Sequence, residues 1–278
     1  MRILVTGGTG HLGQAIVSEL KREHHQVRVL ARTPGSDAHV EWITGDLATG
    51  DGLGEAVADV DVVIHAATNS PAARRGRFKL RDFVHSPADV DVEGTSALVL
   101  AAERAEVKHF LHVSIVGLEH LRRLPYSRRK LEAERIVRTA GVPRTIVRAT
   151  GFYWLVERMF ADMLKRPIVA LPAHVLMEPV DSDEFAQFIV ACVGDGPGGD
   201  REGFAGPETL TMSELMEQYL AARGQQRRIR RAPLPKKVQA ALTASNTSPG
   251  GRVGTTTWAQ WLGRSAPAQG SRVGLVAS

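Results

Sequence analysis

A tyrosine and a lysine four residues apart are the side chains in this sequence best suited to proton transfer. Tyr126 and Lys130 open a helical pattern, in which residues i and i+4 share one face. A tyrosine can donate a proton to a carbonyl oxygen as hydride reaches carbon, and a nearby ammonium should lower the phenol pKa from its usual value of about 10. Ser114, which ends a buried strand, could hydrogen-bond the same oxygen. We predict Ser114, Tyr126 and Lys130 as catalytic residues; the alternative is that Tyr126, after Pro125, only starts a helix.

A glycine-rich segment follows the first predicted strand. Gly7, Gly10 and Gly13 are spaced three apart, between that strand and an amphipathic helix over residues 12–20. Glycine lets the pyrophosphate of a dinucleotide approach the backbone, and a helix N-terminus offers unpaired N–H groups and a positive dipole. The segment predicts a dinucleotide-binding loop; the alternative is a tight strand-to-helix turn without a ligand. The residues predicted to bind the cofactor here are Gly7, Thr9, Gly10, His11, Leu12 and Gly13.

The end of the second predicted strand distinguishes NADP from NAD. An NAD site usually has Asp or Glu there to bind the ribose 2′-hydroxyl, whereas this chain has Arg32, which can pair with a 2′-phosphate and stack on adenine. Asp46 and Leu47, after the third strand, are expected to touch the adenine. Ala66 and Ala67, after the fourth strand, let the cofactor lie close. These residues predict NADP(H) as the cofactor; the alternative for Arg32 is a solvated strand end.

Strand and helix patterns alternate through the first half of the chain. The predicted strands are Arg2–Val5, Val27–Leu30, Val40–Ile43, Val60–Ile64, Phe110–Val113 and Thr145–Val147. This alternation predicts parallel β-α-β units, and right-handed crossovers favour a doubly wound parallel sheet, the Rossmann α/β fold. We expect a dinucleotide-binding domain over 1–150 and a smaller substrate domain over 151–278, with a return of 176–195 to the Rossmann core left open.

Three aromatic residues follow the sixth predicted strand. Tyr153 and Trp154 fall off the apolar stripe of the next helix, at the sheet edge where open α/β folds bind ligands. We predict that Phe152, Tyr153 and Trp154 contact an apolar or aromatic substrate; the alternative is that they dock the smaller domain.

Two basic segments and the C-terminal tail complete the chain. The loop Arg74–Arg81 could attract an anionic substrate, act as a lid or be solvated. The cluster Arg227–Arg231 is expected to form a solvated edge strand. The tail from Ser245 onward is rich in Ser, Gly and Thr, and we expect it to be partly disordered apart from Trp258–Leu262.

The composition excludes several classes of protein. With 43% hydrophobic and 23% charged residues, the 278-residue chain is typical of a soluble globular protein, and no apolar run is long enough to cross a bilayer. The strand pattern begins within Met1–Thr6, which leaves no room for a signal peptide. Cys192 is the only cysteine, and the histidines lack metal-ligand spacing. We expect a cytoplasmic protein with no metal, no membrane partner and, despite a net charge of +5, no nucleic acid.

These motifs together resemble the short-chain dehydrogenase/reductase superfamily, and more narrowly its NmrA-like NAD(P)H-binding branch. The segments that carry the resemblance are Thr6–Gly13, Arg32, Gly45–Leu47, Asp91–Thr95, Val113–Gly117, Tyr126–Lys130, Arg148–Phe152, Glu178–Asp181 and Ala205–Glu208. The resemblance implies NADP(H) binding and matches Ser114, Tyr126 and Lys130 to catalytic positions, with Lys130 also holding the nicotinamide ribose.

The resemblance leaves two functions open, because the branch includes members that bind the cofactor without known turnover. The first is an NADPH-dependent reductase that transfers hydride to a small carbonyl, quinone or related electrophile. The second is a non-catalytic NADP(H)-sensing regulatory protein that binds another protein.

Overall fold

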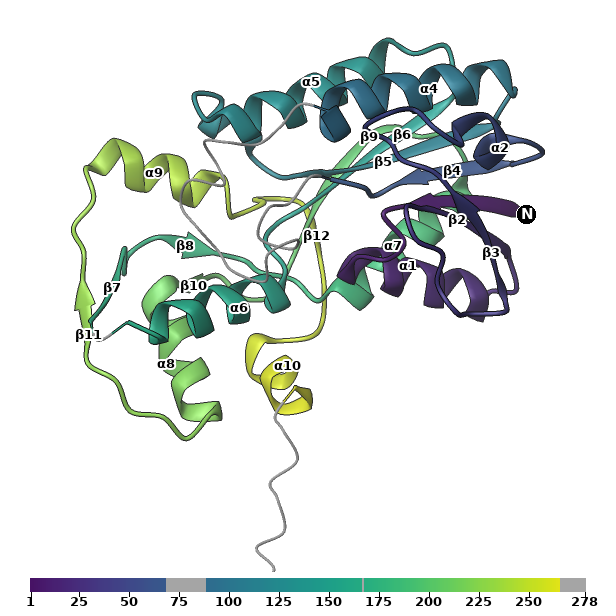
Figure 1. Ribbon diagram of the computed structural model, residues 1–278. Coiled ribbons are helices and arrows are strands. Elements are labelled where there is room, and N and C mark those ends of the chain that lie inside the picture. The colour runs from purple at the N-terminus through teal and green to yellow at the C-terminus, as the bar shows by residue number, and fades with distance from the viewer. Residues whose placement is uncertain (69–88, 167, 266–278) are drawn as a thin grey trace, which may run out of the picture.

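The computed structural model describes residues 1–68, 89–166 and 168–265. Its centre is an eight-stranded sheet of order β12-β9-β6-β5-β4-β1-β2-β3, in which every pair of neighbouring strands is parallel (Figure 1). The strands are β1 (Arg2–Thr6), β2 (Gln26–Ala31), β3 (Val40–Thr44), β4 (Val62–His65), β5 (His109–Ile115), β6 (Arg144–Ala149), β9 (Gly199–Ala205) and β12 (Arg252–Val253). The predicted doubly wound parallel sheet is confirmed.

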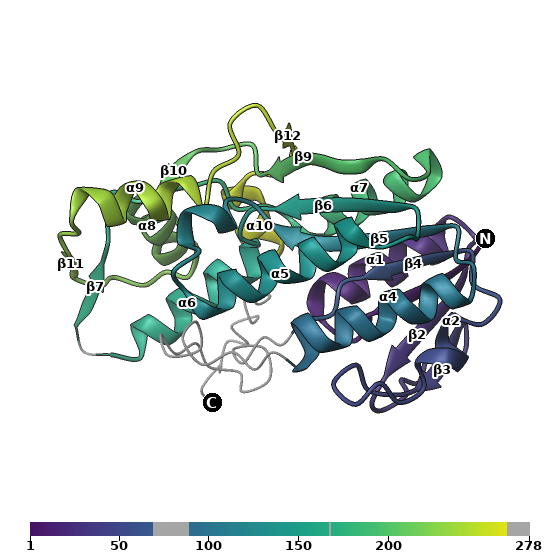
Figure 2. The ribbon, with the colours of Figure 1, turned by 90° about the horizontal axis from the view of Figure 1, so that it is seen from above.

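Helices cover both faces of this sheet, which is why its central strands are apolar on both sides. In Figure 1, α4 and α5 lie over one face and α1 and α7 over the other, and Figure 2 shows α4 and α5 from above. Ile3, Leu4 and Val5 of β1 are fully buried between the two layers. The helices are α1 (His11–Arg22), α2 (Leu53–Val57), α4 (Thr95–Arg104), α5 (Pro125–Thr139) and α7 (Ser182–Asp195), with a 3₁₀ turn η3 (Leu118–Leu121) before α5.

A second apolar core holds the C-terminal elements together. Its centre contains Tyr153, Phe160 and Trp258, each of which is at most 1% exposed. Strands β8 and β10 pair antiparallel, and β7 and β11 pair in parallel. The elements are α6 (Tyr153–Leu164), β7 (Val169–Leu171), β8 (Leu176–Met177), β10 (Leu210–Thr211), α8 (Met212–Ala222), β11 (Ile229–Arg231), α9 (Lys236–Ala244) and α10 (Trp258–Arg264).

The chain passes between the two cores more than once after residue 150. Helix α7 packs on α1, and β9 joins the main sheet beside β6, although both follow β7 and β8 in the sequence. The whole span 182–205 therefore contributes to the Rossmann layer. Strand β12 pairs with β9, so the C-terminal segment reaches the sheet as well.

The segment from Ser245 to Ser265 is structured, so the expectation of disorder is wrong there. Two half-buried carboxylates hold it: Ser248 N–H donates to Glu178 at 2.7 Å, and Thr256 N–H donates to Glu184 at 3.0 Å. Trp258 then anchors the segment in the second core. The basic loop Arg74–Arg81 and residues 266–278 lie outside the described ranges.

Two further properties concern only the described ranges. They contain no helix that is both long and apolar enough to span a membrane. They also contain no group of three His, Cys, Asp or Glu side chains suited to a metal ion.

A row of polar side chains crosses the middle of the sheet under α4 and α5. Thr6, His65 and His112 are register neighbours on β1, β4 and β5. The His65 ring is hydrogen-bonded to Thr6 Oγ1 at 2.7 Å and to Thr95 Oγ1 at 2.9 Å. Burial, with Lys130 nearby, lowers the pKa of His65 to about 3, and burial also lowers the pKa of His112. Both rings are therefore neutral at physiological pH.

Stability should decrease as the pH falls from about 6.5 towards 4, because the folded chain keeps these histidines neutral. His109, whose pKa burial lowers to about 4, adds to the effect. Below a pH of about 6.5 the unfolded chain binds more protons than the folded chain, at up to about 1.4 kcal/mol per pH unit for each histidine. Urea unfolding at several pH values measures this slope. His112→Phe should reduce the slope, and an unchanged slope would show that His112 is not neutral when folded.

Candidate cofactor and active site

Three glycines shape the turn that joins β1 to α1. Gly7 has a φ of +76°, and a Cβ there would lie 2.7 Å from the Ala67 nitrogen. A Cβ on Gly13 would overlap the Gly7 carbonyl oxygen, which accepts a hydrogen bond from Gly10 N–H at 2.9 Å. The turn therefore requires glycine at positions 7 and 13, and it brings the loop against the chain that follows β4.

The N-terminus of α1 lies at the carboxyl ends of the strands. Within the described part of the chain no side chain caps it, and its first turn holds no acidic residue. Thr9, Gly10 and His11 are exposed, whereas Leu12 is half-buried and Gly13 is buried. The N–H groups and the positive end of this helix suit the pyrophosphate of a dinucleotide. The structure therefore gathers the predicted loop residues into one turn of suitable polarity.

Arg32 lies at the same sheet edge, directly after β2. Because Thr6 and Leu30 are register neighbours on β1 and β2, Arg32 follows the strand adjacent to the glycine loop. The side chain is exposed, and none of the described residues forms a hydrogen bond or ion pair with it. An arginine placed in this way is available to a phosphate.

The other residues predicted to bind the cofactor follow β3 and β4. Asp46 is half-buried, and its carboxylate accepts a hydrogen bond from Ala48 N–H at 2.9 Å, which shapes the turn after β3. Leu47 is buried. Ala66 and Ala67 are half-buried and lie against Gly7, where larger side chains would crowd the loop. All four lie at the carboxyl edge, and their contact with a cofactor stays a prediction.

Lys130 is held by a buried carboxylate from a different element. Asp91 lies in η2 (Asp89–Gly94), a π-helical turn that leads into α4. Lys130 Nζ is 3.7 Å from Asp91 Oδ1, and these side chains are 4% and 1% exposed. Thr68 Oγ1 donates to the same oxygen at 2.7 Å. The ion pair fixes the Lys130 ammonium at the sheet edge, and the Asp91 carboxylate compensates its charge.

The pKa of Tyr126 differs from the sequence-based expectation. The side chain is half-buried near the start of α5. Burial and the Asp91 carboxylate raise the pKa of the phenol above its usual value, and a hydrogen bond with Thr68 only partly offsets this increase. The expectation that this pKa is lowered is wrong, because burial and, after it, the Asp91 carboxylate raise it. Tyr126 therefore keeps its proton at neutral pH, which suits a proton donor rather than a base.

Ser114 faces a different part of α5. It is buried on β5, and its hydroxyl lies beside the carboxylate of Glu134, two helical turns beyond Tyr126. Burial would raise the pKa of Glu134, but hydrogen bonds from Arg148, with the Ser114 hydroxyl nearby, hold it below its usual value. Arg148 donates two hydrogen bonds to this carboxylate, at 2.9 and 2.8 Å. The structure brings Tyr126 and Lys130 to one cluster and Ser114 to another, and the catalytic role of Ser114 stays a prediction.

The three aromatic residues after β6 point to different places. Tyr153 is 1% exposed and its hydroxyl donates to the Thr256 carbonyl at 2.8 Å, so it belongs to the second core rather than to an exposed surface. Trp154 instead stacks on His11 of the glycine loop, with ring centroids 4.3 Å apart. Phe152 lies between Trp154 and the Rossmann core, where its ring meets Phe185. Only Trp154 and Phe152 remain candidates for ligand contact.

Sequence reasoning missed the charge partner of Lys130 and the polar row beneath it. In the sequence, Asp91 belongs to a segment that resembles the dehydrogenase/reductase superfamily but has no assigned role. Nothing in the local sequence distinguishes His65 and His112 from other residues of buried strands. Their alternation within β4 and β5, which puts them on the α5 side of the sheet, was the available signal. The stack of Trp154 on His11 had no sequence signal, because it joins residues from two separate elements.

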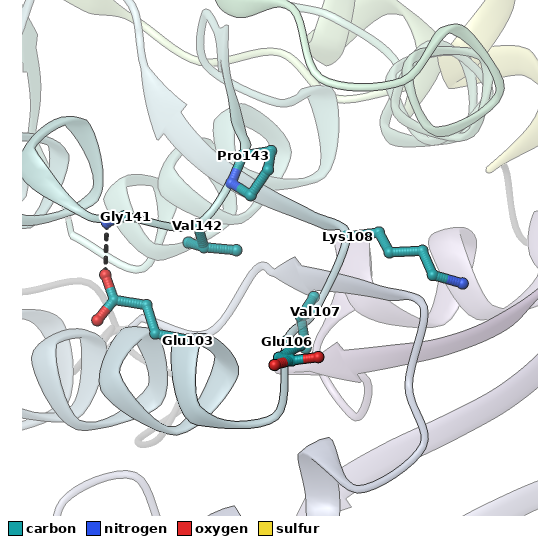
Figure 3. A pocket seen from close by; sticks show the side chains of 7 residues that line it. All are labelled: Glu103, Glu106, Val107, Lys108, Gly141, Val142 and Pro143. Atoms are coloured by element: carbon teal, nitrogen blue, oxygen red, sulfur yellow. Dashed lines mark hydrogen bonds between the residues drawn. The ribbon is translucent and has the colours of Figure 1, made fainter.

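A hollow of about 470 Å³ opens at the opposite edge of the sheet, where the strands begin (Figure 3). It lies where β5 and β6 begin, and its rim includes Glu103, Glu106 and Lys108. Gly141 N–H donates to Glu103 across it, at 2.5 Å. Ligands of open α/β sheets bind at the carboxyl ends of the strands, so this hollow is not the cofactor site.

The parallel sheet, the glycine loop and the Tyr126–Lys130 pair at the carboxyl edge define a nucleotide-binding protein of the short-chain dehydrogenase/reductase type. In agreement, residues 7–195 match the NAD(P)H-binding family. The chain belongs to this family.

The curated relatives include photosystem II assembly factors and steroid dehydrogenases. A photosystem II assembly factor Ycf39 of Trieres chinensis is 28% identical over 195 residues, which cover 68% of this chain and 58% of that protein. The Ycf39 of Cyanophora paradoxa is 32% identical, over 55% of this chain and 46% of that protein. A 3 beta-hydroxysteroid dehydrogenase/Delta 5-->4-isomerase of Mycobacterium tuberculosis is 27% identical, over 81% and 70%. The chain thus spans about half the length of these Ycf39 proteins.

Solved structures share the fold over nearly the whole chain. A nucleoside-diphosphate-sugar epimerase from Staphylococcus aureus superposes with a TM-score of 0.73 at 18% identity, covering 95% of this chain and all of that one. A dTDP-glucose 4,6-dehydratase variant from Streptomyces venezuelae, solved with NAD, gives 0.73 at 21% identity, covering 94% and 96%. At these identities the likeness concerns the fold alone.

Asp91→Asn should lower the pKa of Tyr126 and destabilise the chain. The substitution removes the negative charge beside the phenol and leaves Lys130 buried without its partner, a change that typically costs about 3–5 kcal/mol. Alkaline difference spectra of tyrosinate measure the pKa, with Tyr126→Phe identifying the band, and urea unfolding measures the stability. Glu93→Gln, an exposed carboxylate of the same turn, is the control and should change neither. If both variants behave alike, Asp91 does not govern the site.

Proposed function

We propose that this chain is an NADPH-dependent reductase of the NmrA-like branch, which transfers hydride to a small carbonyl, quinone or related electrophile. The observation that carries the proposal is the cluster of Tyr126, Lys130 and Asp91 at the carboxyl edge of a glycine-loop sheet. It combines a protonated phenol with a fixed ammonium beside a dinucleotide-binding turn. This is the chemistry that reduction of a carbonyl requires.

The residues present fit NADPH. Gly7 leaves a cradle that a Cβ would fill, and the uncapped start of α1 supplies N–H groups for the pyrophosphate. Arg32 would hold the 2′-phosphate, and Lys130 would hold the nicotinamide ribose. NADPH supplies the hydride when it is bound.

The protein contributes the proton and the groups that keep it on the phenol until it is transferred. Tyr126 donates the phenol proton to the substrate oxygen as negative charge develops there. Asp91 and burial keep this proton on the phenol at rest, so the site is set for reduction rather than oxidation. Lys130, fixed in its ion pair with Asp91, lies on the same face of α5 as the donor and orients the bound cofactor.

We expect the substrate to bind at the aromatic surface beside the glycine loop. Trp154 and Phe152 would contact an apolar or aromatic substrate, and the steroid dehydrogenases among the relatives support an apolar substrate class.

A second function has a specific observation in its favour. Asp91 compensates the charge of Lys130, so the ammonium does not activate the Tyr126 phenol by lowering its pKa. A non-catalytic NADP(H)-sensing protein needs no such activation. The relatives named as photosystem II assembly factors support this alternative.

Arg32→Ala should weaken NADPH binding about 10- to 100-fold and leave NADH binding nearly unchanged, because it removes a charge-assisted bond to the 2′-phosphate. Fluorescence titration with both cofactors measures this. Arg104→Ala, another exposed arginine at the opposite edge of the sheet, is the control and should bind both normally. Equal affinity of the unaltered chain for NADPH and NADH would contradict the assignment of NADP.

Tyr126→Phe should lower carbonyl turnover by about 10²–10⁴ and leave NADPH affinity unchanged, since it removes the proton but keeps the ring. Because the phenol must be protonated to act and its pKa is raised, the wild-type rate should hold through a pH of about 10, where an ordinary tyrosine loses its proton. Tyr219→Phe, in the second core, is the control.

The choice of substrate decides how this experiment is interpreted. Hydride transfer to a quinone can need little protonation, so a carbonyl compound is the decisive substrate. Wild-type turnover of such a compound by Tyr126→Phe would refute the mechanism. If no compound in a broad panel of aldehydes, ketones and quinones is reduced while NADPH still binds, the sensing function is the correct one.

A further inference from the structure

Charge is distributed very unevenly along this chain. Residues 218–278 contain ten Lys and Arg and no Asp or Glu, and therefore carry +10. Residues 1–217 carry −5, within a total of +5 for the chain. The basic character of the protein thus comes entirely from its C-terminal segment.

Six of these cations lie within one short stretch, which we call the basic strip. It consists of Arg227, Arg228, Arg230, Arg231, Lys236 and Lys237, all of them exposed. No member of the strip forms an ion pair with another described residue. Two other cations of the C-terminal segment do form ion pairs, Arg223 with Glu157 and Arg264 with Asp181. The strip therefore contributes little to holding the fold together.

The backbone of the strip is nevertheless held in place. Ile229 and Leu234 pack against the second core from within the stretch. Strand β11 pairs in parallel with β7, and Ala232 N–H donates to the Leu171 carbonyl at 2.7 Å. Both views of the ribbon place β11 and α9 at the end of the molecule that is farthest from α2 and β3 (Figures 1 and 2). The cations therefore lie on a segment whose backbone is fixed, at the end of the molecule farthest from α2 and β3.

Exposed aliphatic side chains accompany the strip. In the described ranges six large apolar side chains are prominently exposed, and three of them lie on neighbouring segments: Ile168 (55%), Leu176 (36%) and Val238 (45%). Val238 follows Lys237 directly. Ile168 lies directly before β7 and Arg228 directly before β11, and these two strands are paired from their first residues. The strip itself holds no aromatic side chain of the kind that stacks on unpaired bases.

The carboxylates near the strip do not cancel its charge. Glu157 and Asp162 of α6 are each in an ion pair, with Arg223 and Lys165. Glu217 of α8 is exposed, and Arg166, just before β7, adds a further exposed cation.

We propose that the basic strip docks this protein on a membrane surface that contains anionic lipid headgroups. Fixed cations attract lipid phosphates and carboxylates, and aliphatic side chains among them suit the boundary between headgroups and acyl chains. The expectation of no membrane partner rests on the lack of a membrane-spanning apolar run. Peripheral docking on a membrane surface needs no such run. The proposal is independent of whether the site turns over a substrate.

The test measures co-flotation of the full chain with vesicles of phosphatidylcholine mixed with phosphatidylserine, and with vesicles of phosphatidylcholine alone. We expect binding to the anionic vesicles only, and loss of that binding at high salt. The triple variant Arg228→Ala, Arg230→Ala, Arg231→Ala should bind roughly 100-fold more weakly, about fivefold for each cation removed. NADPH affinity should be unchanged in this variant, which shows that it is folded.

A matched triple variant separates the strip from net charge. Arg22→Ala, Arg104→Ala, Arg135→Ala removes as many exposed arginines from the Rossmann helices and should bind the vesicles nearly as well as the unaltered chain. An equal loss in both triple variants would overturn the proposal. So would strip-dependent binding of poly-L-glutamate or double-stranded DNA without vesicle binding, because the partner would then be an acidic protein or a nucleic acid.

Discussion

The buried ion pair between Lys130 and Asp91 is the interaction on which the candidate active site depends. It ties α5 to η2, and through Thr68 it reaches the chain that leaves β4. Two charges so deeply buried are tolerated only because each compensates the other. Burial is the main reason that His65 and His112 beneath the pair are neutral, and the nearby Lys130 ammonium adds to this effect. Burial and this ion pair together keep the polar row neutral and keep the proton on Tyr126.

Close backbone approach is the second constraint. The glycine loop lies so near Ala66 and Ala67 that a side chain at Gly7 has no room, and the start of α1 lies so near Gly7 that Gly13 must also lack one. Gly94 meets the same requirement in η2, where a Cβ would lie 2.7 Å from the Leu47 carbonyl oxygen. These contacts bring the ends of β1, β3 and β4 together with η2. The cofactor loop and the Lys130–Asp91 pair consequently share one edge of the sheet.

The C-terminal half of the chain completes this edge from the other side. Because Tyr153 is locked in the second core by its bond to Thr256, the next residue, Trp154, is turned outward onto His11. Helix α7 and strand β9 return to the Rossmann layer, and Glu178 and Glu184 bind the segment after Ser245. The two cores are therefore joined by several passages of the chain rather than by one linker. This connectivity places an aromatic surface beside the glycine loop and leaves the basic strip at the far end.

The sequence by itself determined what depends on local spacing. Alternating apolar runs predicted the parallel sheet, the glycine repeat predicted the turn before α1, and the spacing of Tyr126 and Lys130 put both on one helix. Each of these is set by helix or strand geometry within a few residues. Only the tertiary structure decided that Asp91 neutralises Lys130, that Ser114 faces Glu134, that Tyr153 is buried while Trp154 reaches His11, and that the segment after Ser245 is ordered. These outcomes join residues far apart in the chain, and the pKa of Tyr126 depends on burial and on charges that such distant segments bring together.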